Sequence, residues 1–179
     1  KTQEHRVFPN YLNRQFSKVI PYLFFGTDIT YISFSHRFAY LAIIKDIASG
    51  EIVAWHLSQY ITMELVLIMI EQMKRYPNAL IHSDQGFHFT NPAYIEKVTM
   101  LEMIQSMSCK ANCIDNAPIE SFFGHFKDEV DYRSCTTFEQ LYQLIENYIT
   151  YYNCERAQWD RNKMTPVEYR DHLLAQSAA

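Results

Sequence analysis

The sequence contains little of what marks fibrous, cross-linked or membrane-spanning chains. It has only 4 Gly and 6 Pro in 179 residues, which excludes collagen-like, linker-like and low-complexity classes. Its four cysteines include no Cys-x-x-Cys pair and are too few for a disulfide scaffold, so a reducing compartment is expected. The longest apolar run, between Glu64 and Glu71, falls far short of the roughly 18 to 20 residues of a membrane span. We therefore expect a soluble, folded chain.

A basic excess is absent as well. The 16 Lys and Arg are outnumbered by 20 Asp and Glu, and this balance alone argues against a nucleic-acid binder, although bound divalent cations would offset it. The 48% hydrophobic share, with 12 Phe, 13 Tyr and 2 Trp, supplies a sizeable core for one domain. Residues 1–9 lack the apolar centre of a secretory signal and do not begin with Met, so we expect a fragment of a longer protein.

The first hundred residues alternate strand and helix patterns. β-branched and aromatic residues predict three strands, and the turn at 46–50 makes the second and third an antiparallel hairpin. Thr62 can cap a helix, which Pro77 and Asn78 stop. The next strand follows this helix and is therefore expected to run parallel to an earlier one. The expected elements are strands at 23–34, 38–45, 52–57, 79–82 and 103–106, and helices at 62–75 and 92–100.

The remainder of the chain is predicted to be helical. Asp115 or Asn116 can cap a helix with Pro118 in its first turn, and Ile119 to Val130 give it an apolar stripe that must face a core. Thr137 begins a long helix that runs through Asn153, and residues 165–166 open a last one. This order predicts an α/β fold, a mixed five-stranded sheet with helices on both faces. We expect residues 1–22 to form an N-terminal arm or linker and residues 23–175 to form the domain.

Three acidic residues stand where a core or a strand end is expected. Asp28 interrupts a strand, Asp84 follows one, and Glu120 lies in the first turns of a helix. Each has an ordinary alternative: a hydrogen-bonded structural Asp, a turn-forming Asp and a solvated Glu. Together they indicate a site for hard divalent cations, which prefer oxygen ligands on rigid elements and which promote phosphoryl transfer.

Motifs spread over residues 22–174 resemble one family. They are Thr27 to Tyr31 (TDITY), His82 to Gly86 (HSDQG), Asp115 to Phe123 (DNAPIESFF), Lys127 to Glu129 (KDE), Tyr151 to Asn153 with Arg156, and Thr165 to Arg170 (TPVEYR). Asp84 and Glu120 are separated by 35 residues, which is the family's spacing. The sequence is similar to the catalytic core of DDE transposases and retroviral-type integrases, in particular the second-frame transposase of insertion-sequence family three. The resemblance implies the ribonuclease H-like fold.

The resemblance also implies a metal-dependent polynucleotidyl transferase. Asp28, Asp84 and Glu120 would be the catalytic residues and would bind two Mg²⁺ or Mn²⁺ ions for DNA strand cleavage and strand transfer in transposition. The DNA, element ends and target, would be contacted by Lys127, Asn116, Lys110 and Arg156. Lys127 has the alternative of an exposed solubilising residue, Asn116 that of a helix cap, and the tyrosines beside Arg156 that of packing. Family members act as oligomers on DNA in the bacterial cytoplasm, at the nucleoid, and carry an upstream helix-turn-helix region that this chain lacks.

Other functions remain open from the sequence. Cys109, Ala111 and Arg161 depart from the family pattern, and Arg161 in place of an apolar residue would loosen the packing beside the last helix. The alternative is therefore a catalytically inactive ribonuclease H-like module, from a decayed element, that binds DNA or partner subunits. A glycosidase would use Asp28 and Glu120 as acid and base. Cys109 and Cys113, with His125 nearby, form half of a zinc pattern without a second pair.

Overall fold

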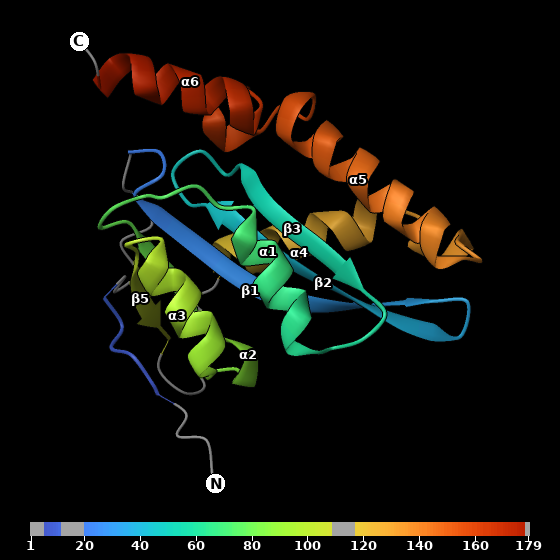
Figure 1. The fold of residues 1–179 in the computed structure, drawn as a ribbon. Coiled ribbons are helices and arrows are strands. Elements are labelled where there is room, and N and C mark those ends of the chain that lie inside the picture. Colours follow the sequence, from blue (N-terminus) through green and yellow to red (C-terminus); the bar gives the residue numbers. More distant parts are fainter. Residues whose placement is uncertain (1–5, 12–19, 109–116, 178–179) are drawn as a thin grey trace, which may run out of the picture.

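A mixed five-stranded sheet forms the centre of the molecule (Figure 1). The structure is a computed structural model, and it describes residues 6–11, 20–108 and 117–177. β1 is antiparallel to β2, which is antiparallel to β3, while β4 and β5 run parallel to β1. The sheet order is β3-β2-β1-β4-β5, and its mixture of parallel and antiparallel pairs is what the strand and helix patterns predicted. The strands span Phe24–Phe34 (β1), Arg37–Asp46 (β2), Ile52–Ser58 (β3), Leu80–Ser83 (β4) and Ile104–Met107 (β5).

Helices cover both faces of this sheet, which confirms the predicted layers. α1, α2 and α3 pack on one face, and α4 and α5 on the other, while α6 extends beyond α5 (Figure 1). The helices span Met63–Glu71 (α1), Phe87–Thr90 (α2), Pro92–Met100 (α3), Ala117–Glu129 (α4), Phe138–Cys154 (α5) and Pro166–Ser177 (α6). Among the described residues, none of these helices has the length and apolar character to cross a membrane.

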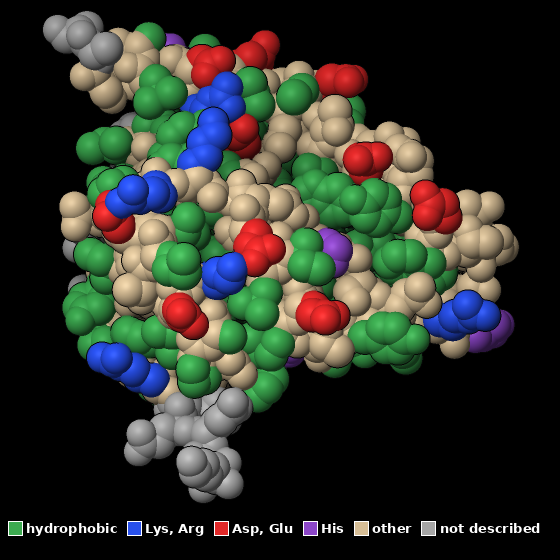
Figure 2. All heavy atoms as spheres, viewed as in Figure 1, with side chains coloured by type: hydrophobic (Ala, Val, Ile, Leu, Met, Phe, Trp, Pro, Cys, Tyr) green, Lys and Arg blue, Asp and Glu red, His purple; other side chains and the backbone are tan. Residues whose placement is uncertain are grey.

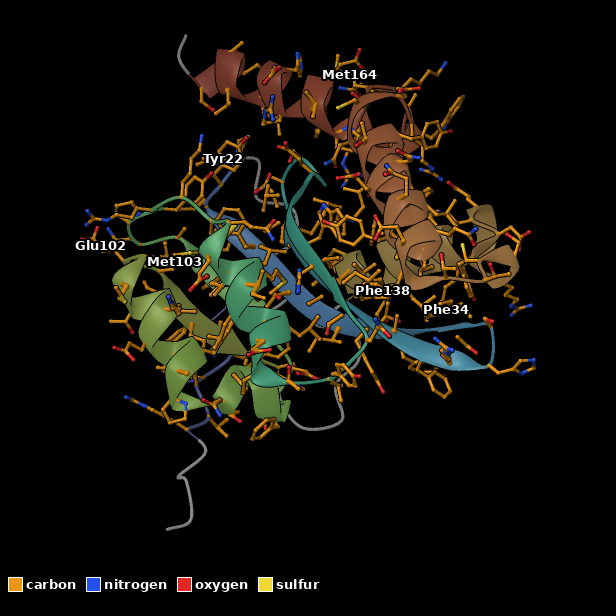
Figure 3. The ribbon with its side chains drawn as sticks, turned by 45° about the vertical axis from the view of Figure 1, so that its right-hand side comes forward. Tyr22, Phe34, Glu102, Met103, Phe138 and Met164 are labelled. Carbon is orange, nitrogen blue, oxygen red and sulfur yellow. The ribbon has the colours of Figure 1, made fainter. Side chains whose placement is uncertain are left out.

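Each face of the sheet has its own apolar core. On the α4 side, Ile32 and Leu41 from the strands meet Phe122, Phe126 and other side chains of α4 and α5. Phe34, at the end of β1, lies beside Phe138, at the start of α5 (Figure 3). On the opposite side, buried residues of β1, β2 and β3 pack against α1 and α3. The two cores hold the middle strand, β1, from both faces, so β1 is a rigid support for a functional side chain.

The turn between β2 and β3 is closed by its own polar residues. Asp46 Oδ2 accepts hydrogen bonds from the backbone N–H of Ser49 at 2.9 Å and from its hydroxyl at 2.6 Å. Gly50 has a φ of +80°, a conformation that costs a residue with a Cβ appreciable strain. Burial raises the pKa of the Asp46 carboxyl, and the hydrogen bonds from Ser49 oppose this rise. The turn fixes the antiparallel hairpin that the sequence predicted.

Helix ends follow the predicted caps in part. Thr137, as predicted, caps α5 and forms a reciprocal capping box with Gln140, whereas the predicted cap at Thr62 was wrong, because this residue makes no side-chain cap hydrogen bond at α1. Asn91, which was not predicted as a cap, caps α3 by accepting from the N–H of Ala93. The prediction of a helix as far as residue 75 was wrong, because α1 ends at Glu71. Gln72 instead donates its side-chain amide to the carbonyl of Trp55 on β3 at 2.7 Å. The apolar pattern alone would continue the helix past Gln72, but this side chain makes the tertiary hydrogen bond to β3 instead.

The described part of the N-terminal segment lies along β5. The N–H of Met107 donates to the carbonyl of Pro9 at 3.3 Å, and the N–H of Tyr11 donates to Ser106 Oγ at 2.9 Å. Phe8 packs against the core on the α1 side. Residues 8–11 therefore cover backbone and side-chain groups of the edge strand, which would otherwise offer a template for pairing.

Candidate active site

Asp28 and Asp84 occupy matching positions on two neighbouring parallel strands. β1 pairs with β4 with Gly26 opposite His82, and two further residues along each strand lead to Asp28 and Asp84. Adjacent strands lie about 4.8 Å apart, so this register brings the two acids together. Both line one pocket of about 190 Å³, beside the middle of β1 and the end of β4. The structure therefore joins two of the three acids that the sequence singled out.

Local backbone contacts hold both carboxylates. Asp28 Oδ1 accepts from the N–H of Ile29 at 2.7 Å, and Asp84 Oδ1 accepts from the N–H of Gly86 at 2.8 Å. The second contact is the turn that was expected as an alternative role for Asp84. It occupies one oxygen only, and Oδ2 of Asp84 has no partner within the described residues. A structural and a ligand-binding role are therefore compatible in the same side chain.

Glu120 is brought to the same face of β1 by the packing of α4. Because side chains alternate along a strand, Asp28 lies on the same face as Gly26. A Cβ at Gly26 would stand 2.7 Å from Ile119 Cδ1, so this glycine lets α4 approach the strand directly beside Glu120. Lys45 of β2 donates its Nζ to the carbonyl of Pro118 at 2.8 Å and fixes the same turn. Glu120 itself is exposed and does not line the pocket of the two aspartates.

The metal-binding capacity of the acids is supported in part. Their carboxylate oxygens are the ligand type that Mg²⁺ and Mn²⁺ prefer. Within the described ranges, however, no three His, Cys, Asp or Glu side chains are close enough together to hold one ion. Asp28 and Asp84 are joined, and Glu120 stands on the adjoining helix turn. Participation of Glu120 in a shared ion site stays a prediction.

Lys127 reaches the rim of the candidate site from α4. Its Nζ lies 5.3 Å from the centre of the Tyr31 ring, and Tyr31 lines the pocket that holds both aspartates. Tyr31 is 62% exposed and meets Phe38 edge to face, with ring centres 5.9 Å apart. A cation held beside an exposed ring next to two acids suits a contact with a DNA phosphate, which was the expected role of Lys127.

Arg156 is engaged within the protein. Its Nε donates to both carboxylate oxygens of Glu129, at 3.0 and 2.9 Å, and its Nη2 donates to Oε1 at 2.5 Å. This guanidinium holds the pKa of Glu129 below its usual range, and Tyr148 adds a hydrogen bond at 3.0 Å. Tyr152 is buried against Phe122, so packing explains this tyrosine. Within the described residues, the two N–H groups of Nη1 and one N–H of Nη2 of Arg156 are left for further acceptors.

Several predicted site residues lie outside the described residues. Lys110 and Asn116, both expected to contact DNA, are among them, and so are Cys109, Ala111 and Cys113. Their roles therefore stay predictions. His82, considered beside Asp84, is buried and lies 2.9 Å through Nδ1 from Ser106 Oγ.

Two basic residues, Lys45 and Arg161, make contacts inside the protein that the sequence did not indicate. Lys45 is 3% exposed, and burial together with the nearby Arg161 charge lowers its pKa to about 7. The only sequence signal was a Lys that interrupts the apolar run from Leu41 to Ile47. Arg161 was expected to loosen the packing near the last helix, and this was wrong. Its Nε donates to the carbonyl of Ser49 at 2.6 Å and so closes the β2–β3 turn.

Comparison with known proteins identifies the family of this site. Two family models, both described as integrase core domain, match residues 21–113 and 120–174. A transposase-like protein of Haemophilus influenzae is 37% identical over 97% of this chain and 86% of its own length. The chain belongs to the integrase core family. The putative transposase InsK for IS150 of Escherichia coli K12 is 33% identical over 91% of the chain. The chain spans 59% of that relative's length, and 61% of the length of the E. coli InsF transposase for IS3A.

Solved structures with the same fold are retroviral integrases. The HTLV-2 integrase catalytic core in complex with magnesium has a TM-score of 0.67 and 16% identity, over 85% of this chain and 98% of that one. The simian T-cell lymphotropic virus intasome chain has the same TM-score, with 14% identity over 93% of this chain and 59% of that one. The integrase core therefore has the ribonuclease H-like fold that the resemblance implied.

Proposed function

We propose that this integrase core cuts DNA strands and joins them to new DNA in a transposition reaction, with Asp28, Asp84 and Glu120 as ligands of two Mg²⁺ or Mn²⁺ ions. The observation that carries the proposal is the register of β1 and β4, which brings Asp28 and Asp84 into one pocket. The integrase core family and its transposase relatives give the class of reaction. The magnesium complex of the HTLV-2 integrase core supports the choice of metal.

Glu120 is proposed as the third ligand because of where α4 is anchored. Ile119 packs on Gly26, and Lys45 holds the carbonyl of Pro118 on the other side of the same turn. The turn that carries Glu120 is therefore fixed to β1, on the face of the strand from which Asp28 projects. We propose that the exposed carboxylate of Glu120 completes the set of ligands when the ions are bound.

The proposed chemistry consists of two phosphoryl transfers. In the first, water attacks the phosphorus of a phosphodiester at the element end, the bond to the 3′ oxygen breaks, and a 3′ hydroxyl is released. In the second, this hydroxyl attacks a phosphodiester of the target, and one strand bond replaces another. Divalent ions held by Asp28, Asp84 and Glu120 would supply activation of the attacking oxygen and stabilisation of the leaving oxygen. The carboxylates hold the ions, Lys127 holds a backbone phosphate, and no covalent bond to the protein forms.

DNA is the proposed partner, and an oligomer on DNA is the proposed active state. Side chains of both signs are scattered over the described part of the face that bears α1 and α3 (Figure 2), so this face shows no predominance of basic side chains. Lys127, Lys110, Asn116 and Arg156 are the proposed contacts. We propose residues 23–175 as the catalytic core and residues 1–22 as its arm, in a bacterial protein that acts at the nucleoid.

A strand-nicking assay with a branched DNA substrate tests the proposal. The folded 179-residue chain is titrated with Mg²⁺ and with Mn²⁺, and cleaved and joined products are measured. We expect product that depends on the metal and that falls at least about 100-fold in Asp84→Asn, because the substitution removes a ligand charge from the pocket. Glu139→Gln, which changes an exposed acid at the start of α5, is the matched control and should keep full activity.

Three results would count against this function. Product that persists after chelation would favour metal-free hydrolysis, as in the glycosidase alternative. Full activity in Asp84→Asn would remove this acid from the site. A folded wild-type chain that gives no product at any metal concentration would support the inactive binding module.

A further inference from the structure

A second pocket lies on the other flank of α4, away from the acids. It has a volume of about 630 Å³ and shares no lining residue with the pocket of Asp28 and Asp84. One wall is Lys45 of β2, another is the flank of α4, and the third is the segment 156–161 that follows α5. Figure 3 marks Met164 near this junction between α5 and α6. We call it the linker pocket. Its size is in the range of small-molecule sites in proteins.

Positive charge predominates in the lining of the linker pocket. Lys45, Arg156 and Arg161 line it together with His125, and Asp160 is the one acid in the lining within the described residues. The Asp160 side chain is 75% exposed, so water screens its pairing with Arg161. A partly enclosed space with this balance of charge attracts anions.

Hydrogen-bond donors are left over in the linker pocket. Gln158 is 7% exposed, and its Nε2 has no acceptor at hydrogen-bond distance within the described residues, while its Oε1 accepts from Arg161. Nη2 of Arg161 and Nη1 of Arg156 also have no partner in the described part of the chain. Buried donors without acceptors are costly and indicate a ligand with acceptor oxygens.

Lys45 strengthens the case for an anion. Its Nζ has one acceptor, the carbonyl of Pro118, whereas an ammonium group has three N–H donors. Burial and the nearby Arg161 charge lower the pKa of Lys45 to about 7, so added negative charge in the pocket would favour its charged form. A phosphate oxygen would supply both the charge and the missing acceptors.

An exposed aromatic ring stands in the lining of the same pocket. Trp159 is 82% exposed, and Lys163 Nζ lies 4.5 Å from the centre of its ring. Exposed tryptophans next to basic groups provide surfaces on which nucleic-acid bases stack. The linker pocket thus combines basic side chains that can donate further hydrogen bonds with an aromatic surface on which a base can stack.

We propose that the linker pocket binds a phosphate group of a nucleotide, with Lys45, Arg161 and Gln158 as donors and Trp159 stacked on a base. The proposal rests on the DNA function above when the nucleotide is part of a DNA strand. A free mononucleotide offers the same phosphate and base, and the experiment distinguishes the two sources. The pocket would then hold a stretch of DNA on the flank of α4 opposite to Glu120.

Binding is measured without catalysis, so that its outcome does not depend on the proposed chemistry. Fluorescence anisotropy of labelled single-stranded and duplex DNA is recorded with Asp84→Asn protein in the presence of a chelator. Quenching of tryptophan fluorescence by deoxyadenosine monophosphate is recorded in parallel. Lys45→Met and Trp159→Ala are the test variants, and Lys74→Met, an exposed Lys after α1, is the charge-matched control. Trp159→Ala alters a surface side chain, so it keeps the test valid if Lys45→Met does not fold.

The expected result is a DNA affinity that falls about tenfold in Lys45→Met, with a slope of log affinity against log salt that is smaller by about one phosphate contact. Trp159→Ala should lower the affinity for single strands several-fold, and Lys74→Met should change neither quantity. Loss of nucleotide quenching in Lys45→Met, which keeps Trp159, together with DNA binding equal to that of the parent would assign the pocket to a free nucleotide. If the variants match the parent in both assays, the proposal is overturned. If the variants show these losses of binding but the folded wild-type chain does not cut DNA, the catalytic proposal alone is refuted.

Discussion

Replacing Lys45 by Met is expected to make the protein more stable at neutral pH. Lys45 is 3% exposed, and its pKa in the fold is about 7 against 10.5 for an ordinary Lys. Between these two values the unfolded chain binds a proton that the folded chain does not, so the stability from this group rises with pH across that window. Below pH 7 Lys45 is protonated in both the folded and the unfolded chain, and the full free-energy cost of burying its charge lowers the stability of the fold. Met carries no charge and avoids this cost.

The size of the effect follows from the two pKa values. The cost of keeping Lys45 buried is about 4 kcal/mol at pH 7 and about 2 kcal/mol at pH 9. The variant also loses the bond from Nζ to the carbonyl of Pro118, which contributes about 1 kcal/mol. We expect Lys45→Met to raise the free energy of unfolding by about 3 kcal/mol at pH 7 and by about 1 kcal/mol at pH 9.

Urea denaturation followed by circular dichroism at the two pH values measures this difference. Other groups that titrate in the window occur in both proteins and cancel. Lys74→Met, which changes an exposed lysine, should alter stability little at either pH. A variant that is less stable than the parent at pH 7, or a gain that is equal at both pH values, would show that Lys45 is not held near neutrality by burial.

Three further substitutions test the packing and charges around the site. Gly26→Val should lower the melting temperature, with a cost of about 1 to 3 kcal/mol, because the new Cβ would stand 2.7 Å from Ile119 Cδ1; equal melting temperatures would contradict this contact. Glu129→Gln should lower the free energy of unfolding by about 0.5 kcal/mol at pH 7, because Arg156 lowers the pKa of Glu129 and the pair is partly exposed. This contribution is present above the pKa of Glu129 in the unfolded chain, so the denaturation curves of variant and parent should converge as the pH falls through its pKa in the fold. Lys127→Ala should reduce DNA affinity and the salt slope by about one contact, and an unchanged slope would place this lysine away from phosphate.

Local patterns were sufficient to predict the strands and where the two aspartates fall relative to them. β1 is read from its β-branched and aromatic residues, and β4 from a short apolar run that ends at Asp84. A strand that follows a helix is expected to run parallel to an earlier strand. The register that sets Asp84, just after β4, beside Asp28, in the middle of β1, is a tertiary pairing that short windows of sequence do not specify.

The contacts around α4 and α5 could not be predicted from short windows of sequence. Arg156 and Glu129 are 27 positions apart, and nothing local indicates that they pair. Arg161 reaches Ser49 across 112 positions. A charged residue in an apolar strand pattern, as at Lys45, is normally assigned to the solvent side, since only the packed helix shows that its amine is enclosed. These residues make tertiary contacts, and the sequence does not indicate which residues are their partners.

The central claim is that three acids from separate elements share metal ions, and a crystal of the chain soaked in Mn²⁺ tests it most directly. Anomalous scattering locates the ions without reference to any assay of activity. The account predicts peaks in the pocket between Asp28 and Asp84, with a carboxylate oxygen of Glu120 within about 2.5 Å of one of them. Saturating Mn²⁺ that leaves this pocket without a peak, or peaks that Glu120 does not reach, would contradict the claim.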